Sequence, residues 1–240
     1  MHRSPTRIVP LLLAVASLAA FAGCGKSGGS SSTATPATAA ATTDTTTTQA
    51  SNGCQTVSAP PPKGAGHLPK PKLKLDPGKT WTATVATSCG TFTITLDVKR
   101  APKTSASFAS LAKKGFYDQL TFHRIVPGFV IQGGDPLGTG TGGPGYSVVE
   151  APPKNLHYTH GIVAMAKAGN EPSGASGSQF FVVTAPTDAG LPPEYALLGK
   201  VTQGLDVVDT IGSADLDPSS PGDGPPASPI VIDSVKIAGR

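Results

Sequence analysis

Residues 122–135 read FHRIVPGFVIQGGD, and the rest of the chain is organised around this stretch. It is mostly apolar, yet Arg124 stands in the middle of it. Removing a guanidinium from water is costly unless an acceptor meets it, because arginine carries five donors and no acceptor. Strand alternation would put Val130 and Gln132 on one face. The stretch therefore predicts a shallow apolar pocket with an arginine at its wall.

Short segments with strand-like patterns lie on both sides of this stretch. Residues 81–86 and 92–96 alternate apolar and polar side chains around a Ser-Cys-Gly turn, as β-hairpins do. Further strands are expected at 161–166, 179–184, 197–201 and 229–237, and 122–135 itself reads as strand, turn, strand. Helix start and stop signals bracket 101–114 and 205–212. Many short strands with two helices indicate a β-barrel or a β-sandwich.

Length and charge exclude some classes of protein. The chain has 240 residues, of which 38% are hydrophobic, which suits one domain of ordinary size with tails. The formal net charge is +4, and it falls to about +2 if an N-terminal segment carrying Arg3 and Arg7 is removed. That charge is too weak to indicate a nucleic-acid partner.

The N-terminus reads as an export signal. Residues 1–23 combine a basic start with an apolar run that is too short for a comfortable membrane span, which needs about 20 apolar residues. The run ends in small residues before Cys24 and resembles the lipobox of bacterial lipoproteins, in which the cysteine is acylated. The chain is therefore expected outside the cytoplasm, anchored to the bacterial cell membrane through Cys24. The alternative is a secreted protein with an ordinary signal.

Two low-complexity segments follow the signal. Residues 24–52 contain no Val, Ile, Leu, Met or aromatic residue and should form a disordered tether. Residues 53–79, called the extension below, hold six prolines and five lysines. The extension could lie across the domain surface, prolong the tether, or meet anionic lipid head groups through its lysines. A solvated basic spacer is the favoured interpretation.

Four motifs resemble those of one family. Residues 122–135 resemble the core motif of the cyclophilin-type peptidyl-prolyl isomerases, and 174–182, GASGSQFFV, resemble the second signature of that family. Residues 138–146 and 161–166, which lie between these two, match the family as well. The resemblance covers roughly residues 80–240. It implies a closed eight-stranded antiparallel barrel capped by two α-helices, within a mainly β domain.

The resemblance also implies a function and a site. The chain would act as a monomer that isomerises X-Pro bonds of exported polypeptides, without a cofactor or metal. Arg124 would be the catalytic guanidinium, and Gln132 would hold both Arg124 and the substrate carbonyl. A proline pocket would be formed by Phe129, Val130, Phe181 and Leu191. Other substrate contacts would come from His123, Ala166, Lys167, Ala168, Gln179 and Tyr195. The rival hypothesis is a barrel that binds proline-containing segments without turnover.

A glycine-rich motif at 138–143, GTGTGG, matches G-x-G-x-x-G, but this is not interpreted as a dinucleotide site. That fingerprint needs a following helix whose N-terminus meets the phosphates. Here Pro-Gly and then a strand-like segment at 146–149 follow instead. The sequence therefore argues against nucleotide binding.

Histidine and cysteine residues leave further alternatives. His157 and His160 have H-x-x-H spacing but lack the further ligands that a metal site needs, so they are interpreted as structural or surface residues. Cys54 and Cys89 in an exported protein favour an internal disulfide. The alternatives are two reduced thiols or an intermolecular bond.

Overall fold

The structure is a computed structural model that describes residues 53–240. The predicted signal 1–23, the predicted lipid attachment at Cys24 and the predicted tether 24–52 lie outside the described residues. Over residues 53–240, no helix is both long and apolar enough to span a membrane.

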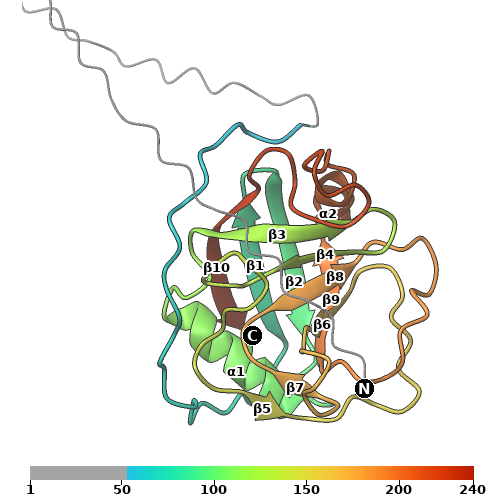
Figure 1. Cartoon of the computed structure of the whole chain (residues 1–240). Coiled ribbons are helices and arrows are strands. Elements are labelled where there is room, and N and C mark those ends of the chain that lie inside the picture. Colours follow the sequence, from blue (N-terminus) through green and yellow to red (C-terminus); the bar gives the residue numbers. More distant parts are fainter. Residues whose placement is uncertain (1–52) are drawn as a thin grey trace, which may run out of the picture. The chain divides into compact units, whose positions relative to one another are not determined.

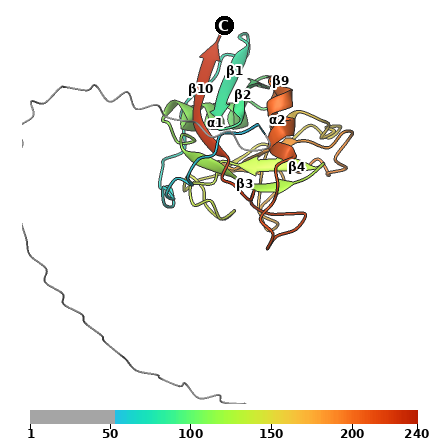
Figure 2. The same ribbon diagram turned by 90° about the horizontal axis from the view of Figure 1, so that it is seen from above.

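The described region forms a closed antiparallel barrel with the strand order β1-β10-β3-β4-β8-β6-β9-β2 (Figures 1 and 2). Its strands are β1 (Trp81–Thr87), β2 (Gly90–Leu96), β3 (Leu120–Val126), β4 (Val130–Gly133), β6 (Ile162–Met165), β8 (Phe180–Val183), β9 (Leu197–Gln203) and β10 (Val231–Gly239). A separate two-stranded sheet pairs β5 (Val148–Val149) with β7 (Ala175–Ser176). The eight-stranded barrel expected from the sequence is confirmed.

Two helices, α1 (Pro102–Lys113) and α2 (Leu205–Gly212), lie at opposite ends of the barrel in the view of Figure 1. Proline at the first position of α1 costs no hydrogen bond, because that N–H has no partner inside a helix. The next two N–H groups donate to the carboxylate of Glu150, at 3.1 and 2.8 Å. A distant acid therefore supplies the N-terminal cap of α1, which Ala101 cannot supply.

Strand alternation divides the apolar residues into two clusters. Ile131 packs inside the barrel, in a core that includes Phe122 and Phe180. Val130 and Phe181 instead belong to a second cluster, called the outer cluster below. Adjacent residues of β4 and β8 thus face opposite sides of the barrel wall, as the period of two requires.

The extension packs on the barrel, so the interpretation of a solvated spacer was wrong. Its backbone donates from Gly66 to the carbonyl of Gly143 at 3.0 Å and from Leu68 to the carbonyl of Pro144 at 2.8 Å. Leu75 is 6% exposed and belongs to the interior core. Scattered leucines between lysines and prolines therefore bury enough apolar surface to hold this segment in place.

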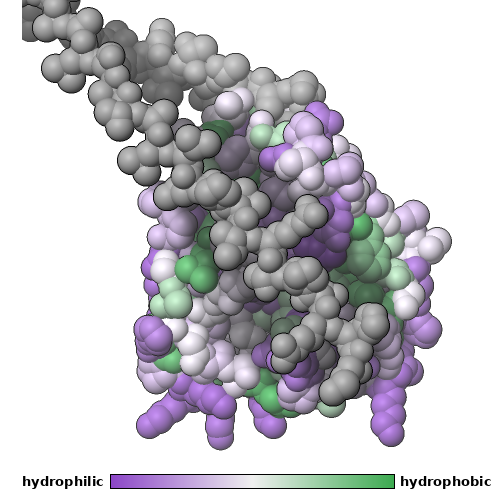
Figure 3. All heavy atoms as spheres, in the orientation of Figure 1, coloured by the Kyte–Doolittle hydropathy of each residue, from purple (hydrophilic) through white to green (hydrophobic). Residues whose placement is uncertain are grey.

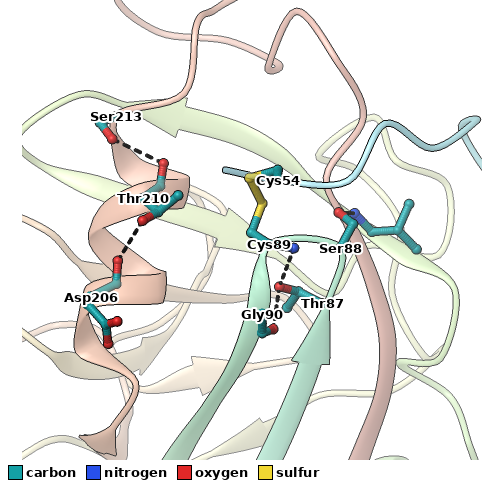
Figure 4. Close-up of a disulfide and its surroundings, with 9 residues drawn as sticks. Cys54, Thr87, Ser88, Cys89, Gly90, Asp206, Thr210 and Ser213 are labelled. Carbon is teal, nitrogen blue, oxygen red and sulfur yellow. Dashed lines mark hydrogen bonds between the residues drawn. A yellow bond between two sulfur atoms is a disulfide. The ribbon is translucent and has the colours of Figure 1, made fainter. Parts of the chain in front are cut away.

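A disulfide joins the start of the extension to the first hairpin (Figure 4). Cys54 and Cys89 are 35 residues apart in the sequence, and their sulfur atoms lie 2.04 Å apart. Beside this bond, the N–H of Gln55 donates to the carbonyl of Ser88 at 2.7 Å. The turn after β1 therefore holds one end of the extension covalently.

Surface polarity is mixed on the face seen in Figure 3, where hydrophobic areas lie among hydrophilic side chains. Among the described residues, Val149 is the one large hydrophobic side chain that is exposed, at 49%. The other large apolar side chains that contribute to the described surface are therefore partly buried.

Candidate active site

Strand register sets four residues of the candidate site in a row. Arg124 of β3 pairs with Gln132 of β4, Gln132 pairs with Phe181 of β8, and Phe181 pairs with Ala164 of β6. Phe181 and Ala164 belong to the outer cluster, so the row runs along the outside of the barrel wall. Directly paired residues on neighbouring strands share a face, which brings the guanidinium to the edge of an apolar surface.

A chain of hydrogen bonds runs from Arg124 across the two glutamines. The Nη1 of Arg124 donates to Oε1 of Gln132 at 3.1 Å, and Nε2 of Gln132 donates to Oε1 of Gln179 at 2.9 Å. The Nε2 of Gln179 donates in turn to the carbonyls of Gly140 and Gly142, both at 2.9 Å. Each amide is thereby fixed in one orientation, and Gln132 holds Arg124 as the resemblance implied.

Asp223 binds the other edge of the guanidinium. Its Oδ1 accepts from Nε of Arg124 at 2.6 Å, and its Oδ2 accepts from Nη2 at 2.8 Å. The hydrogen bonds raise the pKa of Arg124 and lower the pKa of Asp223. Within residues 53–240, Asp223 and Gln132 use three of the five arginine donors in this way, so two are left for a ligand.

Sequence reasoning missed Asp223, which lies 99 residues after Arg124. Asp223 belongs to residues 213–229, called the acidic loop below, which are rich in Pro, Ser and Gly. The arginine itself was the available signal, because a half-buried guanidinium needs acceptors and carboxylates are rare near it in the sequence. Only the fold shows which acid of the loop supplies them.

The four residues of the predicted proline pocket come together in the outer cluster, which includes Phe129, Val130, Phe181 and Leu191. Tyr195, predicted as another substrate contact, packs in the same cluster. The Phe181 and Tyr195 rings meet edge to face with centroids 5.4 Å apart, an arrangement that aromatic pairs favour. The carbonyl of Phe129 accepts N–H groups of Thr184 and Ala185, at 2.9 and 3.1 Å. These bonds fix the β4 entry turn against the end of β8.

Tyr158 positions the far side of this wall and was also missed. Its buried hydroxyl donates to the carbonyl of Tyr195 at 2.7 Å and accepts from the N–H of Tyr195 at 3.0 Å. Burial raises the pKa of Tyr158 to about 12. Its phenol therefore keeps its proton at neutral pH and can serve as donor and acceptor together.

Residues 166–168 lie on the polar side of the site. The N–H of Ala166 donates to the backbone carbonyl of Gln179 at 2.9 Å. Lys167 folds back so that Nζ donates to the carbonyl of Glu171 at 3.2 Å, which leaves its side chain 7% exposed. Ala168 donates its N–H to the carboxylate of Glu171 at 2.7 Å.

A cavity of about 820 Å³ adjoins the glutamine chain. Gln132, Gln179 and residues 166–168 form part of its lining. Residues 65–67 of the extension line it as well, so a segment outside the family-like region contributes to the candidate groove.

His123 lies behind the glycine-rich loop. Both of its ring nitrogens are buried and make no hydrogen bond within residues 53–240. Burial lowers the pKa of His123, and the charge of Arg124 lowers it further, while Asp135 opposes them. The ring is therefore neutral at pH 7 and adds no second positive charge beside Arg124.

Asp135 shapes the same loop. This carboxylate is 1% exposed and accepts backbone N–H groups of Leu137, Thr139 and Gly140 at 2.8, 3.0 and 2.5 Å. A Cβ on Gly142 would lie 2.0 Å from its Oδ1, so the turn requires glycine there. The strand β5 follows the loop instead of a helix, in agreement with the rejection of a dinucleotide site.

His157 and His160 each contact a different aspartate. His157 pairs with Asp188 at 2.6 Å, and His160 pairs with Asp209 at 2.7 Å. Within the described part of the chain, no group of three or more His, Cys, Asp or Glu side chains could hold a metal ion. The two histidines of the H-x-x-H spacing therefore make separate hydrogen bonds, each to a different aspartate.

Comparison with known proteins gives consistent similarities. The family described as cyclophilin type peptidyl-prolyl cis-trans isomerase/CLD matches residues 82–237. Peptidyl-prolyl cis-trans isomerase B of Bacillus subtilis is 48% identical over 118 residues, which cover 48% of this chain and 79% of that protein. A peptidyl-prolyl cis-trans isomerase of Helicobacter pylori is 41% identical over 141 residues, covering 58% and 84%.

A solved structure has the same fold. It is a cyclophilin-type isomerase of Cryptosporidium parvum, determined in the presence of the dipeptide Ala-Pro. It is 31% identical with a TM-score of 0.59, and the match covers 66% of this chain and 99% of that one. The match therefore extends over nearly the whole of the smaller protein.

Proposed function

Since this chain belongs to the cyclophilin-type peptidyl-prolyl cis-trans isomerases, we propose that it isomerises X-Pro bonds of exported polypeptides and so assists their folding outside the cytoplasm. The observation that supports this most is Arg124, held between Gln132 and Asp223 at the edge of the outer cluster. The Ala-Pro dipeptide present with the Cryptosporidium relative supports proline-containing peptides as substrates.

The reaction asks little of the protein. Rotation about a peptide bond has a barrier of about 18–20 kcal/mol that comes from amide resonance. No bond to hydrogen is broken and no group is transferred, so neither a nucleophile nor an acid–base pair is needed. An acceleration of about a thousandfold to a millionfold corresponds to roughly 4–8 kcal/mol of transition-state stabilisation.

Arg124 can supply that stabilisation because its charged guanidinium is held in one position. Twisting the amide ends its resonance, so the proline nitrogen gains a usable lone pair. A guanidinium donor held near that nitrogen, or near the proline carbonyl, binds the twisted state better than the planar one. The two donors left over by Asp223 and Gln132 are available for this contact.

The apolar wall provides the other half of the mechanism. Phe129, Val130, Phe181 and Leu191 would receive the pyrrolidine ring, which holds one side of the rotating bond. Gln132 would bind the carbonyl on the other side through the second hydrogen of its amide, since the first is bound by Gln179. Because the groups on both sides of the rotating bond are held, the binding energy would keep the substrate in the orientation that favours rotation.

The direct test is the isomerisation rate of a peptide with one X-Pro bond, measured with the purified full-length chain and a chelator. The uncatalysed process takes tens to hundreds of seconds. We expect at least a thousandfold acceleration at saturating enzyme. Peptide binding without acceleration would contradict the proposal and leave a binding module.

We also propose that the protein is anchored to the cell membrane through an acylated Cys24. The basic start, the short apolar run and the small residues before this cysteine support the proposal. One acyl chain binds membranes only marginally, whereas two or more hold a protein firmly. The tether 24–52 would then let the barrel reach substrates away from the bilayer.

A further inference from the structure

Asp223 makes the strongest contact to Arg124, and none of the motifs that mark the family includes it. We propose that Asp223 is a positioning residue, which fixes the plane of the Arg124 guanidinium so that its two remaining donors meet the twisted amide. This inference rests on the proposed catalytic role of Arg124 and assigns a part in the same reaction to the acidic loop.

The backbone of the acidic loop is built to hold Asp223 at this place. Gly224 pairs with Ile125, the residue after Arg124, through bonds of 2.7 and 3.2 Å between their N–H and carbonyl groups. A Cβ on Gly224 would lie 2.4 Å from the Cβ of Ser220, so this approach requires glycine. Gly222 on the other side has a φ of +85°, which favours glycine as well.

The base of the loop is closed by its own bonds. The N–H of Asp217 donates to the carbonyl of Pro225 at 2.9 Å, and the N–H of Ala227 donates to the carbonyl of Asp215 at 2.8 Å. Leu216 packs against the interior core. The acidic loop is therefore closed at its base and attached to both the core and β3. These contacts hold the backbone of Asp223 in place.

The contacts between Asp223 and Arg124 can orient the guanidinium without blocking its access to substrate. Asp223 takes Nε and one hydrogen of Nη2, while Gln132 takes one hydrogen of Nη1. Two partners at different edges define the plane of a rigid fork, and each terminal nitrogen keeps one donor. An acid that blocked substrate binding would also have to accept hydrogen bonds from the two remaining N–H groups of Arg124.

The solvent exposure of the Arg124–Asp223 pair indicates that Asp223 contributes little to the stability of the fold. The side chains of Arg124 and Asp223 are 38% and 53% exposed. Ion pairs this close to water add little to global stability. We therefore expect the loss of Asp223 to change turnover while the melting temperature stays nearly constant.

The test compares two substitutions in the full-length chain. Asp223→Asn removes one negative charge and one acceptor from the fork. Asp217→Asn removes the same charge from the same loop, where the carboxylate binds only Ser219 among the described contacts. We expect Asp223→Asn to lower kcat about three- to tenfold with KM unchanged, and Asp217→Asn to turn over as the native chain does.

A double-substitution cycle with Arg124→Ala separates positioning from a general effect of the loop. If Asp223 acts through the arginine, Asp223→Asn should have no further effect on kcat once Arg124 is alanine. Native kcat in Asp223→Asn, an equal loss in Asp217→Asn, or the same loss in the Arg124→Ala background would overturn the inference. Native turnover of Arg124→Ala alone would overturn the proposed role of the arginine, and this inference with it.

Discussion

Phe180 and Phe181 allow the core and the groove to be tested by the same substitution at adjacent positions. Phe180 is fully buried in the barrel and meets the rings of Phe108, Tyr117 and Phe122 edge to face, at 5.7, 5.9 and 6.1 Å. Phe181 is 4% exposed and faces the outer cluster. Replacing each by alanine removes the same atoms from opposite sides of β8.

The expected loss of stability follows from these surroundings. Truncating a buried phenylalanine to alanine costs about 3–5 kcal/mol, and ring pairs add to the cost. Phe180→Ala should lie near the top of this range because its cavity is enclosed by three rings. Phe181→Ala should lie near 3 kcal/mol because several of its neighbours in the outer cluster, among them Leu191 and Tyr195, are only partly buried. For a domain of this size, Phe180→Ala should lower the melting temperature by roughly 8–20 °C, and Phe181→Ala by roughly 6–12 °C.

The effect on catalysis should run in the opposite order. Phe181→Ala removes the wall against which proline would pack, so KM should rise and kcat/KM should fall at least about tenfold, or 1.4 kcal/mol. Phe180→Ala should keep kcat/KM within about threefold of native. The assays are denaturant unfolding and proline isomerisation, measured well below both melting temperatures. Native KM in Phe181→Ala, or an equal loss of activity in Phe180→Ala, would refute the assignment of the groove.

Three further outcomes are expected. Replacing Cys54 and Cys89 together by serine should lower the free energy of unfolding by about 4 kcal/mol, since the bond closes a loop of 35 residues, and an unchanged denaturant midpoint would contradict this. Because burial lowers the pKa of His123 below 6.5, the unfolded chain binds more protons between about pH 6.5 and the folded pKa. Native stability should therefore fall as the pH drops below about 6.5, and His123→Asn should show a smaller fall; equal pH curves would argue against a buried neutral ring. Cys24→Ser should move the protein from the membrane fraction to the soluble fraction, and continued membrane association would exclude the lipid anchor.

The barrel could be predicted because its strands carry their own pattern. Alternation in β1 and β2 identifies both the strand and its buried face. The two-residue strand β7 could not be predicted, because Ala175 and Ser176 are too few to show a period and pair only through tertiary contact. The extension was misjudged for a related reason, since single leucines among prolines have no period to detect.

The candidate site could also be predicted only where its residues lie within continuous motifs. Residues within continuous motifs, such as Arg124 and Gln132, were identified together, and the structure joins them by a hydrogen bond. Asp223 and Tyr158 act from distant loops through contacts that no local pattern encodes. An arginine predicts that an acceptor exists, but the fold decides which residue supplies it.

Replacing Arg124 by alanine shows whether this guanidinium carries the catalysis. Arg100 provides a matched control, because its guanidinium is also paired with an aspartate, Asp97, but on an exposed turn. We expect Arg124→Ala to lower kcat/KM at least tenfold, about 1.4 kcal/mol, with little change in melting temperature, and Arg124→Lys to recover little of the lost activity. Arg100→Ala should keep native activity. An Arg124→Ala variant with both native melting and native turnover would show that Arg124 has no catalytic role.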